Sequence, residues 1–187
     1  MFSFACPSFA RLLLVVATGV VAACAHSSDV AQPASAGPTT SAPTATERPS
    51  AEAQQLAVVR RYFDEVWSAG KLEALDELLA PDYVNHTPST PNPPPGPGGL
   101  KPIVAAFREA FPDLHFTIED AFVDGDRVAV RVTMEGTHDG TLFGIAPTHK
   151  RVRVGQINIE RFRDGKIVEH WRVTDELGLM KQLGIVK

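Results

Sequence analysis

The sequence has few cysteines and no excess of positive charge, and both shortages exclude classes of function. Its two cysteines, Cys6 and Cys24, lie in the first 24 residues, so a folded domain has neither a disulfide framework nor a thiolate metal site. Lysine and arginine total 18 against 22 aspartates and glutamates, a net charge of -4. Because no basic block occurs, we do not expect nucleic acid as a partner.

The sequence also has little that could cross a bilayer. Residues 12–21 are ten apolar or small residues behind Arg11, a run too short for a membrane span but typical of a signal-peptide core. The run ends in Val21-Ala22-Ala23-Cys24, which resembles the lipobox of bacterial lipoproteins, where the cysteine is lipidated. Ordinary cleavage after small residues is the alternative. We therefore predict a signal peptide over residues 1–24, export to the cell envelope and a membrane anchor at Cys24.

A linker is predicted between this signal and the folded domain. In residues 25–50, 19 of 26 residues are alanine, serine, threonine or proline, and Val30 is the one large aliphatic residue. Such a segment buries too little apolar surface to offset the entropy of ordering it. One domain over residues 51–187 follows, and 44% hydrophobic residues in the whole chain are enough to give it a core.

The domain begins with a helical pattern. Apolar residues recur at three- and four-residue spacing from Leu56 to Trp67, which predicts a helix capped by Ser50 and closed at Gly70. A second short helix over residues 72–79 ends before Pro81, and residues 82–86 read as extended. Prolines and glycines then predict an irregular loop over residues 88–99, followed by a third helix that stops at Pro112.

The second half of the domain reads as strands. Residues 114–118 and 128–134 alternate apolar with polar side chains, and Asp124-Gly125 can join them as a hairpin. In a third strand the apolar positions change phase at Gly155, which predicts a bulge that bends the strand around a cavity. A last strand over residues 166–174 precedes a terminal helical turn. The predicted class is α+β, with helices on one face of a curved antiparallel sheet.

Several motifs follow one another in a set order over about residues 58–184. They are Val59-Arg60-Arg61, Pro81-Asp82-Tyr83, Gly136-Thr137-His138-Asp139-Gly140, Asp164-Gly165-Lys166-Ile167, His170 and the run from Gly178 to Gly184. In this order they resemble the SnoaL-like polyketide cyclases of the nuclear transport factor 2-like superfamily. The resemblance implies a cone-shaped barrel with a deep pocket for a hydrophobic small molecule, a homodimer, and no metal or organic cofactor. The best-known members of that family close a ring in a polyketide ester by intramolecular aldol condensation.

The chain departs from that family at the reacting position. The resemblance places the catalytic aspartate two residues after His170, where this chain has Arg172. On the preceding strand, Gln156 matches a glutamine of the family, whereas Asn158 stands where the family has a histidine. Because arginine stays protonated, Arg172 is expected to bind an anionic or carbonyl group or to pair with an acid.

Two residues are candidates for the missing acid and base. The resemblance favours His170 facing the pocket. Asp175 is the nearest carboxylate after Arg172, but an aspartate ahead of a terminal helix is equally well explained as a helix N-cap.

Three further residues are candidates for ligand contact. His86 and His138 lie near predicted loops, where a histidine more often makes a structural hydrogen bond. Trp67 follows the helical apolar spacing, so it belongs to the core first and to a binding site second. The six histidines show no paired helical spacing, and we predict no metal site.

Two functions of different class remain open from the sequence. One is a cyclase, lyase or isomerase that acts on a hydrophobic carbonyl substrate through Asp175 or His170. The other is a binding lipoprotein that holds a lipophilic molecule without reaction, with Arg172 and Gln156 fixing the polar end.

Overall fold

The computed structural model describes residues 49–187. The predicted signal peptide, Cys24 and the linker up to residue 48 lie outside the described residues. The elements are α1 (Ala51–Arg61), η1 (Tyr62–Ser68), α2 (Ala74–Leu78), β1 (Leu79–Asn85), α3 (Pro97–Ala110), β2 (His115–Asp124), β3 (Arg127–Thr137), β4 (Arg151–Arg163), β5 (Lys166–Thr174) and α4 (Glu176–Leu183).

The first helix begins where the sequence predicts. The hydroxyl of Ser50 accepts a hydrogen bond from the N–H of Ala53 and so satisfies one free donor of the first turn. The helix continues without a break into the π-helical η1, whose Tyr62, Phe63, Val66 and Trp67 are buried. This face joins α2 and α3 in forming the helical side of the core.

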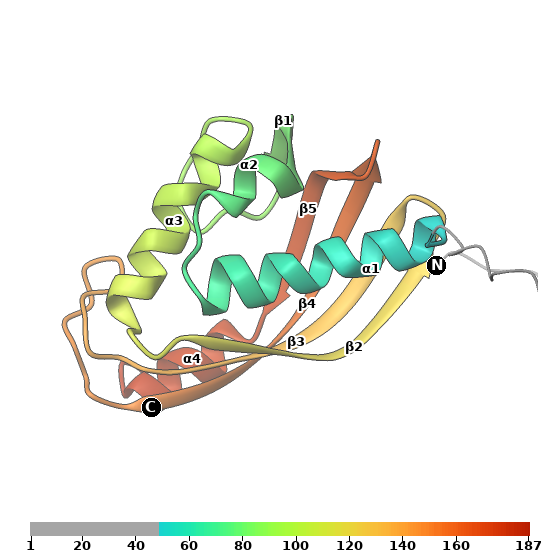
Figure 1. The fold of residues 1–187 in the computed structure, drawn as a ribbon. Helices are drawn as coiled ribbons and strands as arrows, with labels where there is room; N and C mark the ends of the chain where they lie inside the picture. Colours follow the sequence, from blue (N-terminus) through green and yellow to red (C-terminus); the bar gives the residue numbers. More distant parts are fainter. Residues whose placement is uncertain (1–48) are drawn as a thin grey trace, which may run out of the picture. The chain divides into compact units, whose positions relative to one another are not determined.

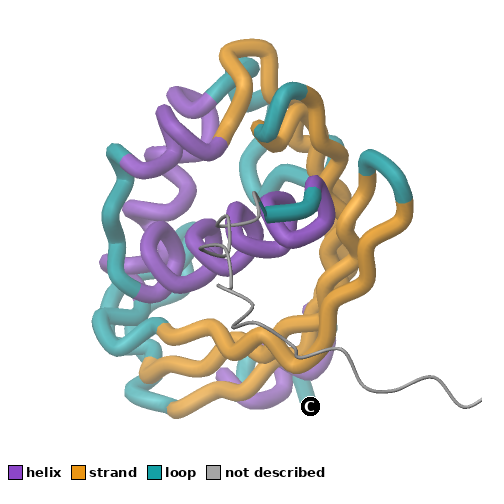
Figure 2. Tube along the Cα trace, turned by 45° about the vertical axis from the view of Figure 1, so that its right-hand side comes forward, coloured by secondary structure: helices purple, strands orange, loops and turns teal. Residues whose placement is uncertain are grey.

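The strands form one curved sheet in the order β1-β5-β4-β3-β2. Figures 1 and 2 show α1 lying across the concave face of the sheet, with α2 and α3 beside it. The α+β class is therefore confirmed, and so is the hairpin of β2 and β3. The sheet differs from the expected antiparallel one at its edge, since β1 enters after α2 and pairs with β5 in parallel.

An aromatic cluster fills the space between helices and sheet. The ring centroids of Trp67 and Phe107 lie 5.8 Å apart, and Trp67 and Phe63 both lie 5.6 Å from the ring of Phe116. These rings join η1, α3 and β2 in one core, and burial of such large apolar surfaces is the main stabilising term in folding. No helix in residues 49–187 is long and apolar enough to cross a membrane.

The predicted bulge at Gly155 is wrong. Strand β4 pairs with β3 without a shift of register from residue 151 to residue 161. The inward-facing positions of β4 keep their alternation but change from apolar to polar along the strand, while Ile157 and Ile159 face outward and are 55% and 36% exposed. The change of hydrophobic phase thus marks the point where the strand leaves the apolar core and begins to line a polar site. The inward set is Val152, Val154, Gln156, Asn158 and Glu160.

The proline-rich loop is shorter than predicted. Helix α3 begins at Pro97, inside the range expected to be irregular, because a proline is tolerated in the first turn of a helix. A Cβ on Gly99 would collide with the carbonyl of Pro94, so the loop is held tightly against the start of α3. The loop therefore packs closely on the first turn of α3.

Candidate functional site

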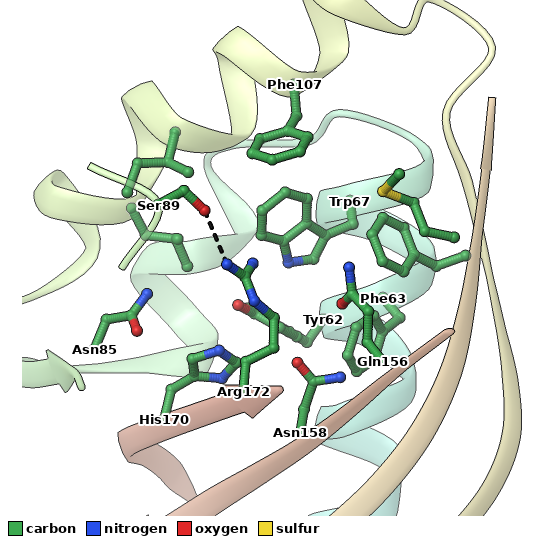
Figure 3. Close-up of a pocket in the computed structure, with 14 residues that line it drawn as sticks. Tyr62, Phe63, Trp67, Asn85, Ser89, Phe107, Gln156, Asn158, His170 and Arg172 are labelled. Carbon is green, nitrogen blue, oxygen red and sulfur yellow. Dashed lines mark hydrogen bonds between the residues drawn. The ribbon is translucent and has the colours of Figure 1, made fainter. Parts of the chain in front are cut away.

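A cavity opens between the helices and the concave face of the sheet. Apolar side chains from η1 and α3 form one wall, and polar side chains from β4 and β5 form the other (Figure 3). We call this the inner cavity, and its volume of about 20 Å³ has room for little more than a water-sized group. It is lined by Tyr62, Phe63, Trp67, Asn85, Ser89, Leu100, Ile103, Phe107, Phe116, Met134, Gln156, Asn158, His170 and Arg172.

Strand alternation and register bring the predicted polar residues together. Alternate residues of a strand share a face, so Gln156 and Asn158 of β4 both point inward, as do His170 and Arg172 of β5. In the β4–β5 ladder Asn158 lies directly opposite Arg172. Five of the eight predicted catalytic and ligand-binding residues therefore line one cavity, the fifth being Trp67 from η1.

A larger cavity, which we call the outer cavity, adjoins the inner one along shared lining residues. It has a volume of about 400 Å³ and shares Ser89, Phe107, Met134, Gln156 and Arg172 with the inner cavity. Its other walls are Thr87, Pro88, Leu142, Phe143, Thr174, Glu176, Leu179 and Met180. A ligand can thus place its body in the outer cavity and its polar end among Gln156, Arg172 and His170.

A buried histidine–glutamate pair lies on the floor of the inner cavity. His170 Nδ1 is 2.8 Å from Glu160 Oε1, and the two residues are 4% and 0% exposed. They are cross-strand partners in the β4–β5 ladder. With Nδ1 engaged by the carboxyl group, Nε2 is the ring nitrogen left to accept or donate a proton.

Glu160 was missed by the sequence analysis. A lone glutamate on a strand resembles a solvent-exposed residue, and Glu160 lies close to the Asp164-Gly165 turn. Its parity with Gln156 and Asn158 was the available signal, because all three occupy the inward face. Within the described part of the chain, Glu160 Oε2 has no hydrogen-bond partner.

Two buried tyrosines, Tyr62 and Tyr83, lie near enough to this pair to be affected by the charge of Glu160. Burial raises the pKa of Tyr62, and the negative charge of Glu160 raises it further. Burial also raises the pKa of Tyr83 well above its usual value, with the neighbouring Tyr62 and Glu160 adding to the shift. Both phenols therefore keep their protons at neutral pH and are available as hydrogen-bond donors.

Arg172 is half-buried and forms no ion pair with any residue of the described range 49–187. Its Nη2 donates to Ser89 Oγ at 2.9 Å, and its backbone N–H donates to Thr87 Oγ1 at 2.7 Å. These bonds tie β5 to the loop that carries Thr87 and Ser89, and Figure 3 shows the bond to Ser89. None of the ion pairs found in residues 49–187 includes Arg172.

Asp175 does not belong to either cavity. Its Oδ1 accepts the N–H of Gly178 at 2.8 Å, so the side chain caps α4. It lies beside Ile157 and Val173 at a hollow on the outer face of the sheet. The helix-cap explanation is therefore confirmed, and the structure gives no support to Asp175 as the catalytic acid and base.

His86 and His138 also lie away from both cavities, contrary to the expected ligand contact. The ring of His86 stacks on Trp171 with centroids 4.6 Å apart, and its Nε2 is 3.9 Å from Glu169. His138 is fully buried, with Nδ1 3.1 Å from Thr148 Oγ1, and burial lowers its pKa. Their positions depend on tertiary packing, which spacing along the chain does not reveal.

The cavities suit an organic ligand better than a metal ion. No group of three or more histidine, cysteine, aspartate or glutamate side chains within residues 49–187 could hold a metal. The polar groups that converge here include a guanidinium, three amides and an imidazole, and the guanidinium repels cations.

Comparisons with known proteins agree with this architecture. The family model of the SnoaL-like polyketide cyclases matches residues 57–183. The aklanonic acid methyl ester cyclase DauD of Streptomyces sp. (strain C5) is 31% identical over 132 residues, which are 70% of this chain and 81% of that protein. The nogalonic acid methyl ester cyclase of Streptomyces nogalater is 29% identical over 120 residues, 63% of this chain and 89% of that one.

Solved structures give the same result. TsrD from Streptomyces laurentii superimposes with a TM-score of 0.67 at 28% identity and covers 74% of this chain and 100% of its own. IdmH from Streptomyces antibioticus does so with a TM-score of 0.61 at 36% identity, over 70% of this chain and 99% of its own. With its fold, its polar-floored cavity and the matched residues 57–183 taken together, the chain belongs to the SnoaL-like polyketide cyclase family.

Proposed function

We propose that the protein catalyses acid–base chemistry on a hydrophobic carbonyl compound, with His170 as the group that takes up and returns the proton. The observation that carries this proposal is the buried His170–Glu160 pair beside a cavity that has one apolar wall and one polar wall. By their names, the curated relatives are cyclases of nogalonic and aklanonic acid methyl esters. We infer the same broad class of substrate here, a carbonyl compound with an acidic C–H bond.

The residues divide the reaction between them. His170 Nε2 removes a proton from the carbon beside the carbonyl, while Glu160 holds Nδ1 and stabilises the imidazolium that forms. The phenol of Tyr62, which keeps its proton and lines the inner cavity, donates a hydrogen bond to the oxygen on which the enolate charge develops. Arg172 and the amide of Asn158 are left to hold the polar end of the substrate. Walls such as Phe107 keep water away, which strengthens these interactions. The proton then returns from the imidazolium to the product.

Binding without reaction is the second candidate. It is favoured by Arg172, which stands where the family resemblance places the catalytic aspartate. Native mass spectrometry of the protein purified from its own host distinguishes the two, because it reveals whether a small molecule copurifies. A bound compound that the wild-type protein converts on incubation supports catalysis. A compound that stays unchanged in both the wild-type and His170→Gln proteins contradicts it and supports a carrier.

We further propose that the protein is exported and anchored to the membrane through a lipid on Cys24. The supporting pattern is the lipobox-like Val21-Ala22-Ala23-Cys24 followed by a linker poor in apolar residues. Cys24→Ser should move the protein from the detergent phase to the aqueous phase of a phase-partition assay, because acyl chains supply most of the membrane affinity. Equal partition of variant and wild type would contradict the anchor.

A homodimer formed through the outer face of the sheet is also proposed. Ile157 and Val173 are cross-strand partners on that face and are 55% and 75% exposed, next to Ile159 at 36%. A contiguous apolar patch of this kind is typical of an interface. Sedimentation should show a dimer for the wild type and a monomer for Val173→Glu. A monomeric wild-type protein would contradict this proposal.

A further inference from the structure

We propose that the ligand of this site is a free carboxylic acid, bound as its carboxylate against Arg172, and not an ester. This inference rests on the proposed function in that it takes the inner and outer cavities as the ligand site. It goes further by naming the group that the polar wall recognises. A hydrophobic body carrying one carboxylate is the expected ligand.

The first argument is the spare hydrogen-bonding capacity of Arg172. A guanidinium has five N–H donors in a fixed fork. The side chain uses one nitrogen, Nη2, in its bond to Ser89, and Ser89 is a neutral partner. Arg172 lines both cavities, and no other side-chain hydrogen bond of its guanidinium is found within residues 49–187, so its remaining donors are open to a ligand. A planar carboxylate matches this fork with two parallel bonds.

The second argument is independent of Arg172. Asn158 is 2% exposed and lines the inner cavity, and its Nδ2 has no hydrogen-bond partner in the described part of the chain. A buried donor without an acceptor is destabilising. Asn158 lies directly across the β4–β5 ladder from Arg172, so both spare donors are on neighbouring positions of one wall. That wall offers donors in excess, which an acceptor-only group such as a carboxylate satisfies.

The third argument is the balance of charge. The charged or titratable side chains that line the two cavities are His170, Arg172, Glu176 and Tyr62, whose phenol keeps its proton. Glu160 is engaged by His170 at 2.8 Å, and Glu176 is exposed at the rim without an ion pair to Arg172 within residues 49–187. A neutral ester filling the site would cover the guanidinium without supplying a counter-charge, which is unfavourable. A carboxylate removes that penalty.

The apolar walls define the rest of the ligand. Phe107, Leu142 and Leu179 line the outer cavity, whose volume of about 400 Å³ accommodates a fused-ring body. The inner cavity is too small for such a body, and only the polar end fits there. The carboxylate is therefore expected at the junction of the two cavities, where Arg172 and Gln156 line both.

The test compares naphthylacetate with its methyl ester, two probes that share one body and differ in charge. Isothermal titration of the full-length protein should show the acid binding about tenfold or more tightly than the ester. In Arg172→Gln, which keeps an amide donor but no charge, this preference should disappear. In Arg60→Gln, which changes an exposed arginine of α1, the preference should remain.

Three results would overturn the inference. They are equal binding of acid and ester by the wild type, a preference that survives in Arg172→Gln, and no binding of the acid at all. His170→Gln separates this inference from the proposed catalysis, because it should keep the acid preference even though it cannot turn over a substrate. Loss of turnover in His170→Gln with an intact preference for the acid supports both proposals. Turnover by the wild type without any preference for the acid contradicts the carboxylate inference but not the proposed catalysis.

Discussion

His170→Gln is expected to reduce turnover by about 10²–10⁴-fold, the usual loss when a general base is removed. Glutamine still offers an N–H group to Glu160, so the buried carboxyl group keeps a partner and the fold is retained. It cannot take up a proton at neutral pH. The measurement is the rate at which aklanonic acid methyl ester and aklanonic acid are consumed, followed by mass spectrometry.

Asp175→Asn provides the matched control for this experiment. Asparagine preserves an oxygen that can accept the N–H of Gly178, so the cap of α4 and the wild-type rate should both be kept. A large loss of rate in Asp175→Asn together with a normal rate in His170→Gln would reverse the assignment of the base. Equal rates in all three proteins would show that neither residue takes part in the reaction.

His170→Leu is expected to lower the free energy of unfolding by about 3 kcal/mol, which makes it the largest stability effect we predict. Leucine has no donor, so Glu160, already 0% exposed and with Oε2 unpaired in the described residues, loses its remaining side-chain partner. Urea denaturation followed by circular dichroism measures this change. Replacing both residues, with His170→Leu and Glu160→Met, should recover most of the loss, because the buried polar group is then gone as well.

A surface pair gives the reference for that measurement. His149 Nδ1 lies 2.9 Å from Asp139 Oδ1, nearly the same separation as in the buried pair, but the His149 side chain is 75% exposed. Asp139→Ala removes this bond without placing a new side chain at His149, whose φ of 55° leucine disfavours, and it should change the stability little, since water replaces the lost bond. A double replacement no more stable than His170→Leu alone would contradict the view that the orphaned carboxyl group causes the loss.

The elements that depend on local sequence were predictable. Ser50 caps the first helix, and the Asp124-Gly125 turn joins a hairpin. Asp175 caps the last helix, which is one of the two roles that its position in the sequence allowed. Each depends on a few neighbouring residues and on hydrogen bonds within the same turn. The parallel pairing of β1 with β5 depends on contacts far apart in the chain, and the sequence analysis did not predict it.

The candidate site was likewise predictable only in part. Gln156, Asn158, His170 and Arg172 were placed together by the resemblance to a known family, and strand alternation agrees with that placement. Glu160 was missed because whether a glutamate on a strand is buried depends on what the neighbouring strand places opposite it, here His170. The change of phase in β4 was visible in the sequence, but it was interpreted as a bulge when it marks a polar inner wall.

Solvent exchange by the wild-type protein tests the central claim most directly. In D2O, a base at the floor of the cavity should remove the acidic C–H proton of a bound carbonyl compound and return deuterium from the solvent-exchanged imidazole. We expect deuterium to enter the compound that copurifies with the protein, or aklanonic acid, much faster with wild type than with His170→Gln. No enzyme-dependent exchange in a compound shown to be bound would contradict an acid–base function and leave the cavity as a binding site.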